Sequence, residues 1–155
     1  MTPDAMRAVA ERHVAAENAG DVGGAVATYA DDCFYENVAL GIRFAGKSAV
    51  GAQYAALFAA VPDGRLRLEG EAFGPDVLVH WGTFEGTVTG EFFGLAPTGR
   101  RLALPFVAIL FFADGRMRGE RLVYDLATLS EQAGFPLDAV QASARMLAAA
   151  LGAAA

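Results

Sequence analysis

Three side chains could take part in proton transfer, because each is a polar group within an otherwise apolar strand pattern. Glu120 and Tyr124 lie in the run Met117–Tyr124, and Glu36 lies in the segment Phe34-Tyr35-Glu36-Asn37. Burial among apolar side chains raises the pKa of a carboxyl group, which can then act as an acid or base near neutral pH. Tyr124 offers a phenol that could orient a carbonyl group. We therefore take Glu120, Glu36 and Tyr124 as candidate catalytic residues.

Each candidate also has an ordinary structural interpretation. Glu120 could pair with Arg118 or Arg121 at the edge of a sheet, and Glu36 could be a surface carboxylate. Tyr124 could belong to the core. The sequence leaves these alternatives open.

The sequence gives less support to a metal site, a reactive cysteine or a nucleotide-binding loop. His13 and His80 are the only histidines, and neither has a second His or Cys at the spacing of a metal site, so we predict no metal. Cys33 follows two aspartates, which disfavour a reactive thiolate. The segment Gly41–Ser48 matches a phosphate-loop pattern, but hairpins follow it instead of the parallel β-α-β units that such a loop requires. We expect no cofactor.

The pattern of apolar residues and turn signals predicts the elements that must position these groups. Helices are expected at Pro3–Ala19, Asp21–Tyr29, Lys47–Ala60, Asp125–Gln132 and from Pro136 to about residue 152. Strands are expected at Cys33–Val38, Gly41–Gly46, Arg65–Phe73, Val77–Thr89, Arg101–Phe112 and Arg116–Tyr124. Helices followed by consecutive hairpins indicate an α+β fold.

Alternation within the last two strands sorts their side chains into faces. One face of the closing strand has Arg118, Glu120, Leu122 and Tyr124. One face of the preceding strand has Phe106, Ala108, Leu110 and Phe112. The Asp114-Gly115 pair between them is a strong hairpin signal.

The segment Gly90–Arg100, the two apolar runs around Asp114-Gly115, and the segment Glu120–Asp125 together resemble the SnoaL-like polyketide cyclases of the nuclear transport factor 2-like superfamily. The resemblance extends loosely from Met6 to Phe135. It implies one domain over residues 1–155, with a core at about 3–134 and an extra C-terminal helix at about 136–152. In that fold, N-terminal helices pack on a curved antiparallel sheet that forms a cone around an apolar pocket.

The resemblance also places the acid/base pair of the aldol-type cyclases on two apolar residues of this chain. The aspartate position falls at Leu122 and the histidine position at Ala108. The family's proton-transfer pair therefore cannot be transferred, although both residues should face the pocket. The predicted substrate-binding residues are Trp81, Leu122, Ala108, Phe106, Leu110, Tyr54 and Phe58. His80 lies on the strand face opposite Trp81, so only one of the two can reach the pocket.

Composition limits the partners. Hydrophobic residues make up 54% of the chain and charged residues 19%, which favours an apolar cavity or a subunit interface, and we expect a homodimer. The net charge is −6, without a cationic cluster, so nucleic acid is not an expected partner. No run of 18 apolar residues and no signal-peptide pattern occurs, so we expect a cytoplasmic protein without a membrane partner.

The sequence thus predicts an enzyme that closes a ring in a polyketide-like intermediate held in an apolar pocket. Folding of the substrate would supply much of the catalysis, as in a pericyclic, spiro or ether-type closure, with limited acid/base assistance. A non-catalytic binding or dimeric scaffold module is the first alternative. Addition of water, as in a hydratase or epoxide hydrolase, is the second.

Overall fold

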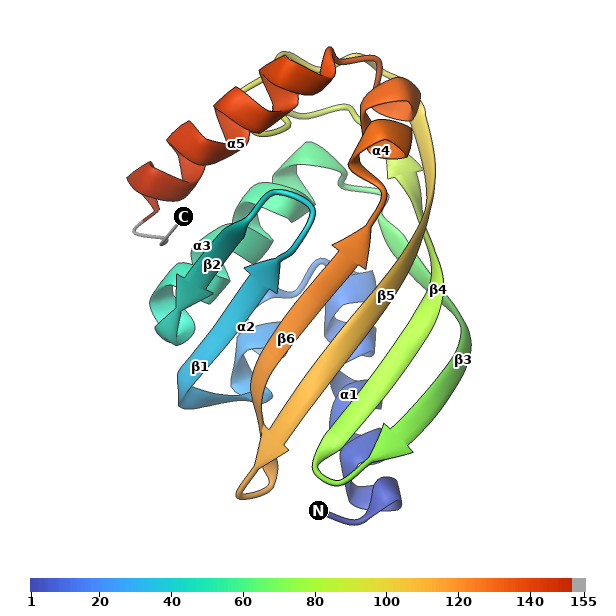
Figure 1. Ribbon diagram of the computed structural model, residues 1–155, viewed down its shortest axis with the longest axis vertical. Coiled ribbons are helices and arrows are strands. Elements are labelled where there is room, and N and C mark those ends of the chain that lie inside the picture. The colour runs from blue at the N-terminus through green and yellow to red at the C-terminus, as the bar shows by residue number, and fades with distance from the viewer. Residues whose placement is uncertain (152–155) are drawn as a thin grey trace.

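The computed structural model describes residues 1–151 (Figure 1). Along these residues, two helices and two strands are followed by a third helix, four strands and two further helices. The helices are α1 (Pro3–Ala19), α2 (Val22–Ala27), α3 (Gly46–Ala60), α4 (Leu126–Ala133) and α5 (Leu137–Ala150). The strands are β1 (Tyr29–Asn37), β2 (Ile42–Ala45), β3 (Arg65–Gly74), β4 (Val77–Thr87), β5 (Arg101–Ala113) and β6 (Arg116–Tyr124). The predicted end of the last helix at residue 152 lies outside the described residues.

The predicted helix boundaries agree closely with the structure because capping residues fix them. The Thr2 hydroxyl accepts a hydrogen bond from the Ala5 amide at the start of α1, and Gly20 ends the helix in the left-handed conformation. Asp21 caps α2 through the Gly24 amide. This second helix is shorter than expected, since Tyr29 already pairs with β6 as the first residue of β1.

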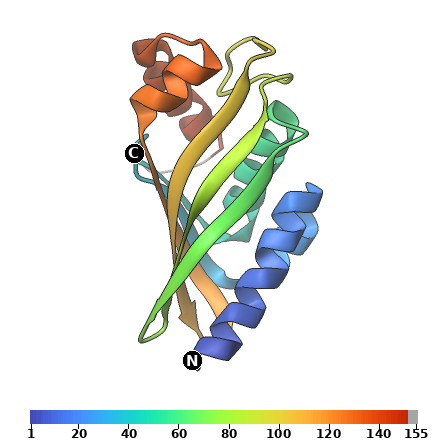
Figure 2. The same cartoon turned by 90° about the vertical axis from the view of Figure 1, so that its right-hand side faces the viewer.

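The six strands form one sheet in the order β2-β1-β6-β5-β4-β3. All neighbours are antiparallel except β1 and β6, which run parallel. The sheet is strongly curved, and α1 lies against one side of it, while α4 and α5 lie at one end (Figure 2). This topology places the start of β1 beside the closing strand, although about 90 residues separate them in sequence.

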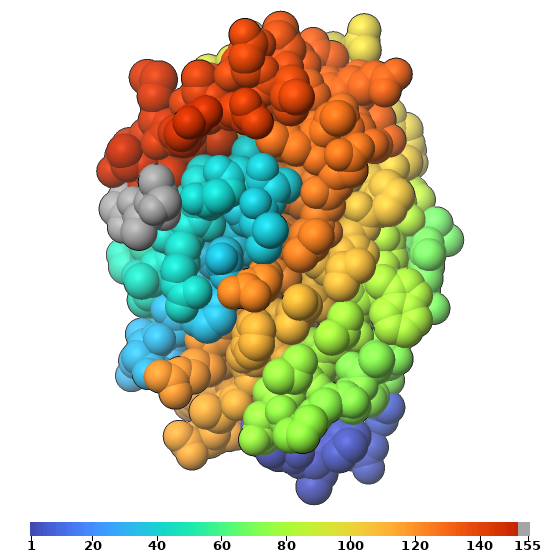
Figure 3. Space-filling view, viewed as in Figure 1, coloured from blue at the N-terminus to red at the C-terminus, as the bar shows by residue number. Residues whose placement is uncertain are grey.

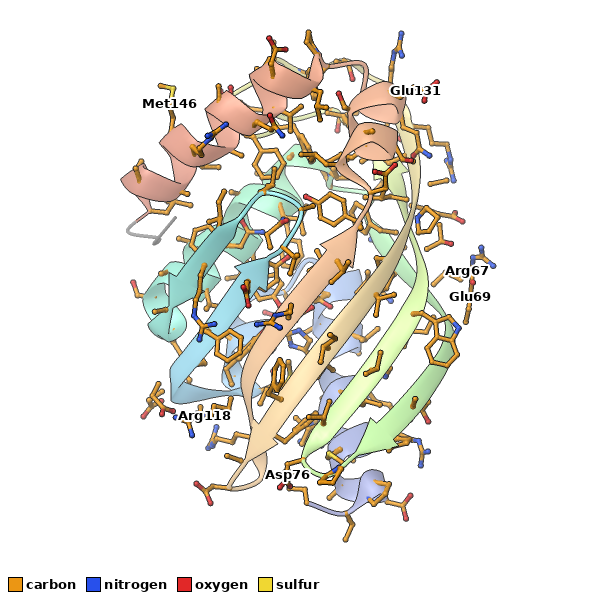
Figure 4. All side chains as sticks on the ribbon, in the orientation of Figure 1. Arg67, Glu69, Asp76, Arg118, Glu131 and Met146 are labelled. Carbon is orange, nitrogen blue, oxygen red and sulfur yellow. The ribbon has the colours of Figure 1, made fainter. Side chains whose placement is uncertain are left out.

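A bulge interrupts β6 at Arg118. Gly119 pairs with Phe111, whereas Met117 pairs with the next residue of β5. The extra residue turns Arg118 to the outside of the molecule (Figure 4). The prediction that Arg118 shares a face with Glu120 is therefore wrong, because strict alternation fails at a bulge.

The main core fills the space between the concave face of the sheet and helices α1 to α3. A second cluster lies under α4, where Leu129 and Ala133 pack against β5. None of the helices in the described residues combines the length and the hydropathy needed to cross a membrane.

Candidate functional site

A cavity of about 100 Å³ lies between α1, α3 and the concave face of the sheet. Its wall is mainly apolar, and the apolar residues that line it include Val14, Leu57, Phe58, Val61, Leu66, Leu68, Phe84, Phe92, Phe93, Leu102, Leu104, Phe106, Ala108, Leu110, Leu122 and Leu129. A smaller group of polar side chains reaches the same space, namely His13, Glu17, Asn18, Tyr35, Asn37, Gln53, His80, Glu120 and Tyr124. An apolar hollow with a few converging polar groups is the usual form of a small-molecule site.

Glu120 is the buried carboxylate of this site. Its Oε2 atom accepts hydrogen bonds from the hydroxyls of Tyr29 and Tyr54, each at 2.8 Å, and lies 3.5 Å from His13 Nε2. Oε1 has no hydrogen bond to the described residues. Because no fully buried polar side-chain atom among these residues lacks a partner, Oε1 is accessible from the cavity. One oxygen is thus fixed by the protein and the other faces the space for a ligand.

Four elements bring these groups together. His13 lies on α1, Tyr29 opens β1, Tyr54 lies on α3, and Glu120 follows the bulge of β6. The parallel pairing of β1 with β6 sets Tyr35 directly opposite Glu120. The sequence alone could not indicate this convergence.

The hydrogen bonds of His13 Nδ1 define its role as a donor. Thr28 Oγ1 donates its single proton to the Ala25 carbonyl at 2.7 Å. His13 Nδ1 lies 2.9 Å from the same Oγ1, which can therefore only accept from it. Nδ1 is protonated in this arrangement.

The other ring nitrogen, Nε2, lies 3.0 Å from the Tyr54 oxygen. When Tyr54 donates its proton to an ionised Glu120, its oxygen can only accept from Nε2, so both nitrogens of His13 carry protons. Burial alone would lower the pKa of His13, but the charges of Glu17 and Glu120 outweigh it and raise that pKa. The site holds an imidazolium cation against a carboxylate.

The two carboxyl groups beside His13 differ in protonation. Burial would raise the pKa of Glu120, but the charge of His13 and the hydrogen bonds from the hydroxyls of Tyr29 and Tyr54 lower it below its usual value. The sequence-based expectation of a raised pKa for Glu120 is therefore wrong. Glu17, whose Oε2 lies 3.7 Å from His13 Nε2, has a pKa raised to about 7, chiefly by burial.

Most of the predicted pocket residues line the cavity. Tyr124 does so with its hydroxyl held at 3.0 Å by the Asn37 amide, and burial raises its pKa to about 12, which keeps the phenol neutral. The other predicted residues that line the cavity are Phe58, Phe106, Ala108, Leu110, Leu122 and Glu120.

Three predicted placements are corrected. Glu36 points to the other face of the sheet, where Arg121 Nε lies 2.8 Å from it, because alternation along β1 turns Tyr35 and not Glu36 inward. Trp81 is also on the outer face and is 41% exposed, with its ring over Gly70 at a bulge of β3. Its neighbour His80 faces the cavity instead.

Tyr54 is the third correction. It does not line the cavity, since its side chain is fully buried and its hydroxyl forms hydrogen bonds with Glu120 and His13. Its contribution to the site is to orient Glu120 and His13.

His13 and Glu17 are site residues that were not predicted from the sequence. They are four residues apart on α1 and so share one face of the helix. A histidine on the apolar stripe of a helix, followed by a carboxylate on the same stripe, was the signal that could have identified them.

His13, Glu17 and Glu120 also offer three potential metal-ligand atoms within 4.8 Å of one another. A metal would need an unprotonated nitrogen, whereas Nε2 of His13 acts as a donor toward Tyr54 in the network described above. The arrangement of donors and acceptors fits a proton network better than a metal centre.

Comparison with known proteins identifies the fold and the family. Residues 7–133 match the profile of the SnoaL-like polyketide cyclases. No curated protein matches the chain.

Solved structures with the same fold include three informative relatives. A proposed SnoaL-like polyketide cyclase from Jannaschia sp. CCS1 is 19% identical, with a TM-score of 0.79, and the alignment covers 88% of this chain and 97% of that one. A protein with a ketosteroid isomerase-like fold from Catenulispora acidiphila DSM 44928 is 19% identical, with a TM-score of 0.73 and coverage of 89% and 98%. IdmH from Streptomyces antibioticus, a proposed polyketide cyclase, is 20% identical, with a TM-score of 0.69 and coverage of 83% and 97%. The expected α+β cone is confirmed.

Proposed function

Since this chain belongs to the SnoaL-like polyketide cyclase family, we propose that it closes a ring in a polyketide-like intermediate bound in the cavity. The family's aldol acid/base positions are Leu122 and Ala108 here, so a different group must handle protons. Glu120 is that group in our proposal. The apolar wall holds the flexible substrate in a folded conformation, which removes part of the entropic barrier to closure.

One observation supports this proposal above all others, namely that the free oxygen of an ionised Glu120 faces an apolar cavity. The hydroxyls of Tyr29 and Tyr54 and the charge of His13 replace the water that a carboxylate loses on burial. Such a group can accept a proton from a C–H bond next to a carbonyl or from a hydroxyl. Tyr124 supplies a neutral phenol on the same wall that can bind a carbonyl oxygen.

The test is turnover of linear poly-β-ketone thioesters, followed by mass spectrometry of the cyclised product. We expect Glu120→Gln to reduce turnover by about 10²- to 10⁴-fold, the usual contribution of acid/base catalysis. Glu36→Gln is the matched control, because it removes a carboxylate from the neighbouring strand on the opposite face of the sheet. Unchanged turnover in Glu120→Gln would leave substrate folding as the only source of catalysis.

A non-catalytic binding module is the second candidate, and the apolar residues Leu122 and Ala108 at the family's acid/base positions favour it. A saturable increase in the fluorescence of 8-anilinonaphthalene-1-sulfonate without turnover of any thioester would support it. Absence of saturable binding would contradict both candidates.

We also propose that the protein forms a homodimer through the outer face of the sheet. Strands β4, β5 and β6 have no helix across their middle on this face (Figure 3). Trp81, Val107 and Val123 are cross-strand neighbours in one row, and all three are exposed. A row of exposed apolar side chains on a sheet favours burial against a partner.

A further inference from the structure

This inference rests on the proposed function and extends it. We propose that Glu17 is the acid of the reaction, that Glu120 is its base, and that His13 returns the proton from Glu120 to Glu17 after each turnover. The substrate class then narrows to compounds that carry an acidic C–H bond next to one carbonyl and a second carbonyl as the acceptor.

The first support is the arrangement of the two carboxyl groups around one imidazole nitrogen. Nε2 of His13 lies 3.5 Å from Glu120 Oε2 and 3.7 Å from Glu17 Oε2. Both carboxyl groups line the same cavity, and the side chain of Glu17 is 12% exposed. A substrate in the cavity can therefore reach both groups at once.

The second support is the balance of charge around Glu17. The titratable groups that face it are His13 on its own helix, Glu120 on β6, Tyr54 on α3, Tyr29 and Tyr35 on β1, and His80 on β4. His13 is the cation nearest to both carboxylates, and burial lowers the pKa of His80, so that His80 is neutral near pH 7.

One cation cannot compensate two buried carboxylates, so one of them keeps a proton. Glu120 receives two phenolic hydrogen bonds in addition to the charge of His13, and it is the ionised member. Glu17 keeps its proton below its pKa of about 7 and loses it above that pH. An active site often obtains an acid and a base from two neighbouring groups because their environments shift the two pKa values in opposite directions.

The proposed cycle balances without another reactant. Oε1 of Glu120 takes a proton from the carbon next to a carbonyl, and the electron pair of the broken C–H bond becomes the enolate. The enolate carbon forms the ring bond to the second carbonyl, whose oxygen takes the proton of Glu17. Glu120 is then protonated and Glu17 is ionised.

The network resets the site by three short transfers. His13 Nε2 passes its proton to Glu17, across a 3.7 Å gap that a small side-chain movement closes. Tyr54 passes its proton to Nε2 across 3.0 Å. Rotation of the Glu120 carboxyl group about its Cγ–Cδ bond brings the protonated oxygen to the position of Oε2, 2.8 Å from the Tyr54 oxygen, which takes the proton. These transfers restore the original state.

The first test uses 2-tetralone, an apolar ketone, and follows its hydrogen–deuterium exchange in D₂O by NMR between pH 5 and 9. With its single carbonyl beside Glu17, the ketone enolises by taking the Glu17 proton as Glu120 removes the α-hydrogen, so we expect the wild-type rate to fall above pH 7 as Glu17 loses its proton. Glu17→Gln should slow exchange at least tenfold at pH 6 and abolish the decrease in exchange rate above pH 7. If Glu17 had only a structural role, that decrease would remain in the variant. Glu11→Gln, on the exposed side of the same helix, is the matched control and should behave as wild type.

The second test needs no substrate. Protein labelled with ¹³C at the glutamate side-chain carboxyl carbons is titrated by NMR, with Glu17→Gln used to assign the Glu17 signal. A midpoint near pH 7 for Glu17 is expected, and a midpoint below pH 5 overturns the proposal whatever the ketone assay gives.

The two proposals fail in different ways. If Glu120→Gln abolishes exchange while Glu17→Gln retains the wild-type rate and pH profile, Glu17 is not the acid and the proposed function stands. If Glu120→Gln exchanges 2-tetralone as fast as a catalytically active wild type, Glu120 is not the base and the proposed function fails with it.

Discussion

At the scale of single residues, the state of Glu120 depends on which of two opposing effects is larger. Burial favours the neutral acid, whereas two phenolic donors and the charge of His13 favour the carboxylate, and the pKa of Glu120 is lowered because these interactions are the stronger. Each donor should therefore have a measurable effect on both the stability of the protein and the protonation of Glu120.

Tyr54→Phe and Tyr29→Phe each remove one phenolic donor. We expect each to reduce the free energy of unfolding by about 1–3 kcal/mol, as for hydrogen bonds to charged groups, and to raise the pKa of Glu120. The effect of Tyr54→Phe should be the larger, since Tyr54 also contacts His13. Urea denaturation measures the first effect and the acid limb of the ketone exchange rate measures the second. Tyr124→Phe, which leaves both donors in place, should not move that limb.

The buried groups also predict how stability depends on pH. The folded state holds the Glu17 proton up to about pH 7, whereas an unfolded glutamate loses it near 4.5, so stability should fall as pH rises between these values. The difference corresponds to about 3 kcal/mol. Charged His13 acts in the same direction through its pairing with Glu120, since this contribution is complete below pH 6.5 and is lost as pH rises through its raised folded pKa. It is not independent of the Glu17 contribution, because the charge of Glu17 also raises the His13 pKa.

Denaturation curves at pH 5, 6, 7 and 8 measure this fall. We expect the stability of Glu17→Gln to change with pH over this range by no more than half as much as that of wild type, with Glu11→Gln as the exposed control. Parallel curves for wild type and Glu17→Gln would contradict the assignment of Glu17 as a buried, protonated group.

At the scale of elements, the loop between β4 and β5 closes one end of the cavity. Phe92 and Phe93 line the cavity, and Phe92 stacks on Phe135 beyond α4. The loop can reach α3 because Gly90 has no side chain, and its amide donates to the Ala60 carbonyl at 2.9 Å.

Gly90→Ala should separate this loop from α3. A Cβ atom at this position would lie 1.9 Å from the carbonyl oxygen of Ala59, which is backbone and cannot rotate away. We expect a loss of stability of about 1–3 kcal/mol, as for other overpacked sites, and weaker dye binding in the cavity. Gly74→Ala is the control, because its nearest neighbour is 3.9 Å away, and it should change stability by less than about 0.5 kcal/mol.

At the scale of the whole molecule, one face of the sheet is covered by helices and the other is open. The row of Trp81, Val107 and Val123 runs across the open face, and Arg121 and Glu36 form an ion pair on the same face. Such a surface suits a second copy of the chain, because apolar contact in the middle of an interface combines with polar groups around it.

Val107→Glu places a charge in the middle of this row and should convert a homodimer into a monomer. Light scattering coupled to size exclusion measures the mass directly. Met146→Glu is the control, since Met146 is the most exposed of the large apolar residues on α5, at 75%, and projects from that helix at the edge of the molecule (Figure 4). A wild-type mass of one chain would contradict the proposed dimer.

The helices and strands could be predicted from the sequence, because capping residues, turn residues and the alternation of side chains act over a few neighbouring residues. Capping residues placed the ends of α1, the Asp114-Gly115 pair placed the hairpin of β5 and β6, and alternation turned Glu120, Leu122 and Tyr124 inward. The alternation of inward and outward side chains along β6 fails at Arg118, because the bulge adds one residue to this strand.

Which side chains contact one another on the concave face of the sheet depends on the tertiary structure and could not be predicted from the sequence. A strand pattern indicates that a side chain points inward but not what lies opposite, and His13, Tyr29 and Tyr54 reach Glu120 from three other elements. The same limitation explains the wrong placements of Trp81 and Glu36, whose faces depended on the register of strands far apart in the chain. The charge on Glu120 was beyond prediction for that reason, since a pKa depends on neighbours in space and not on neighbours in sequence.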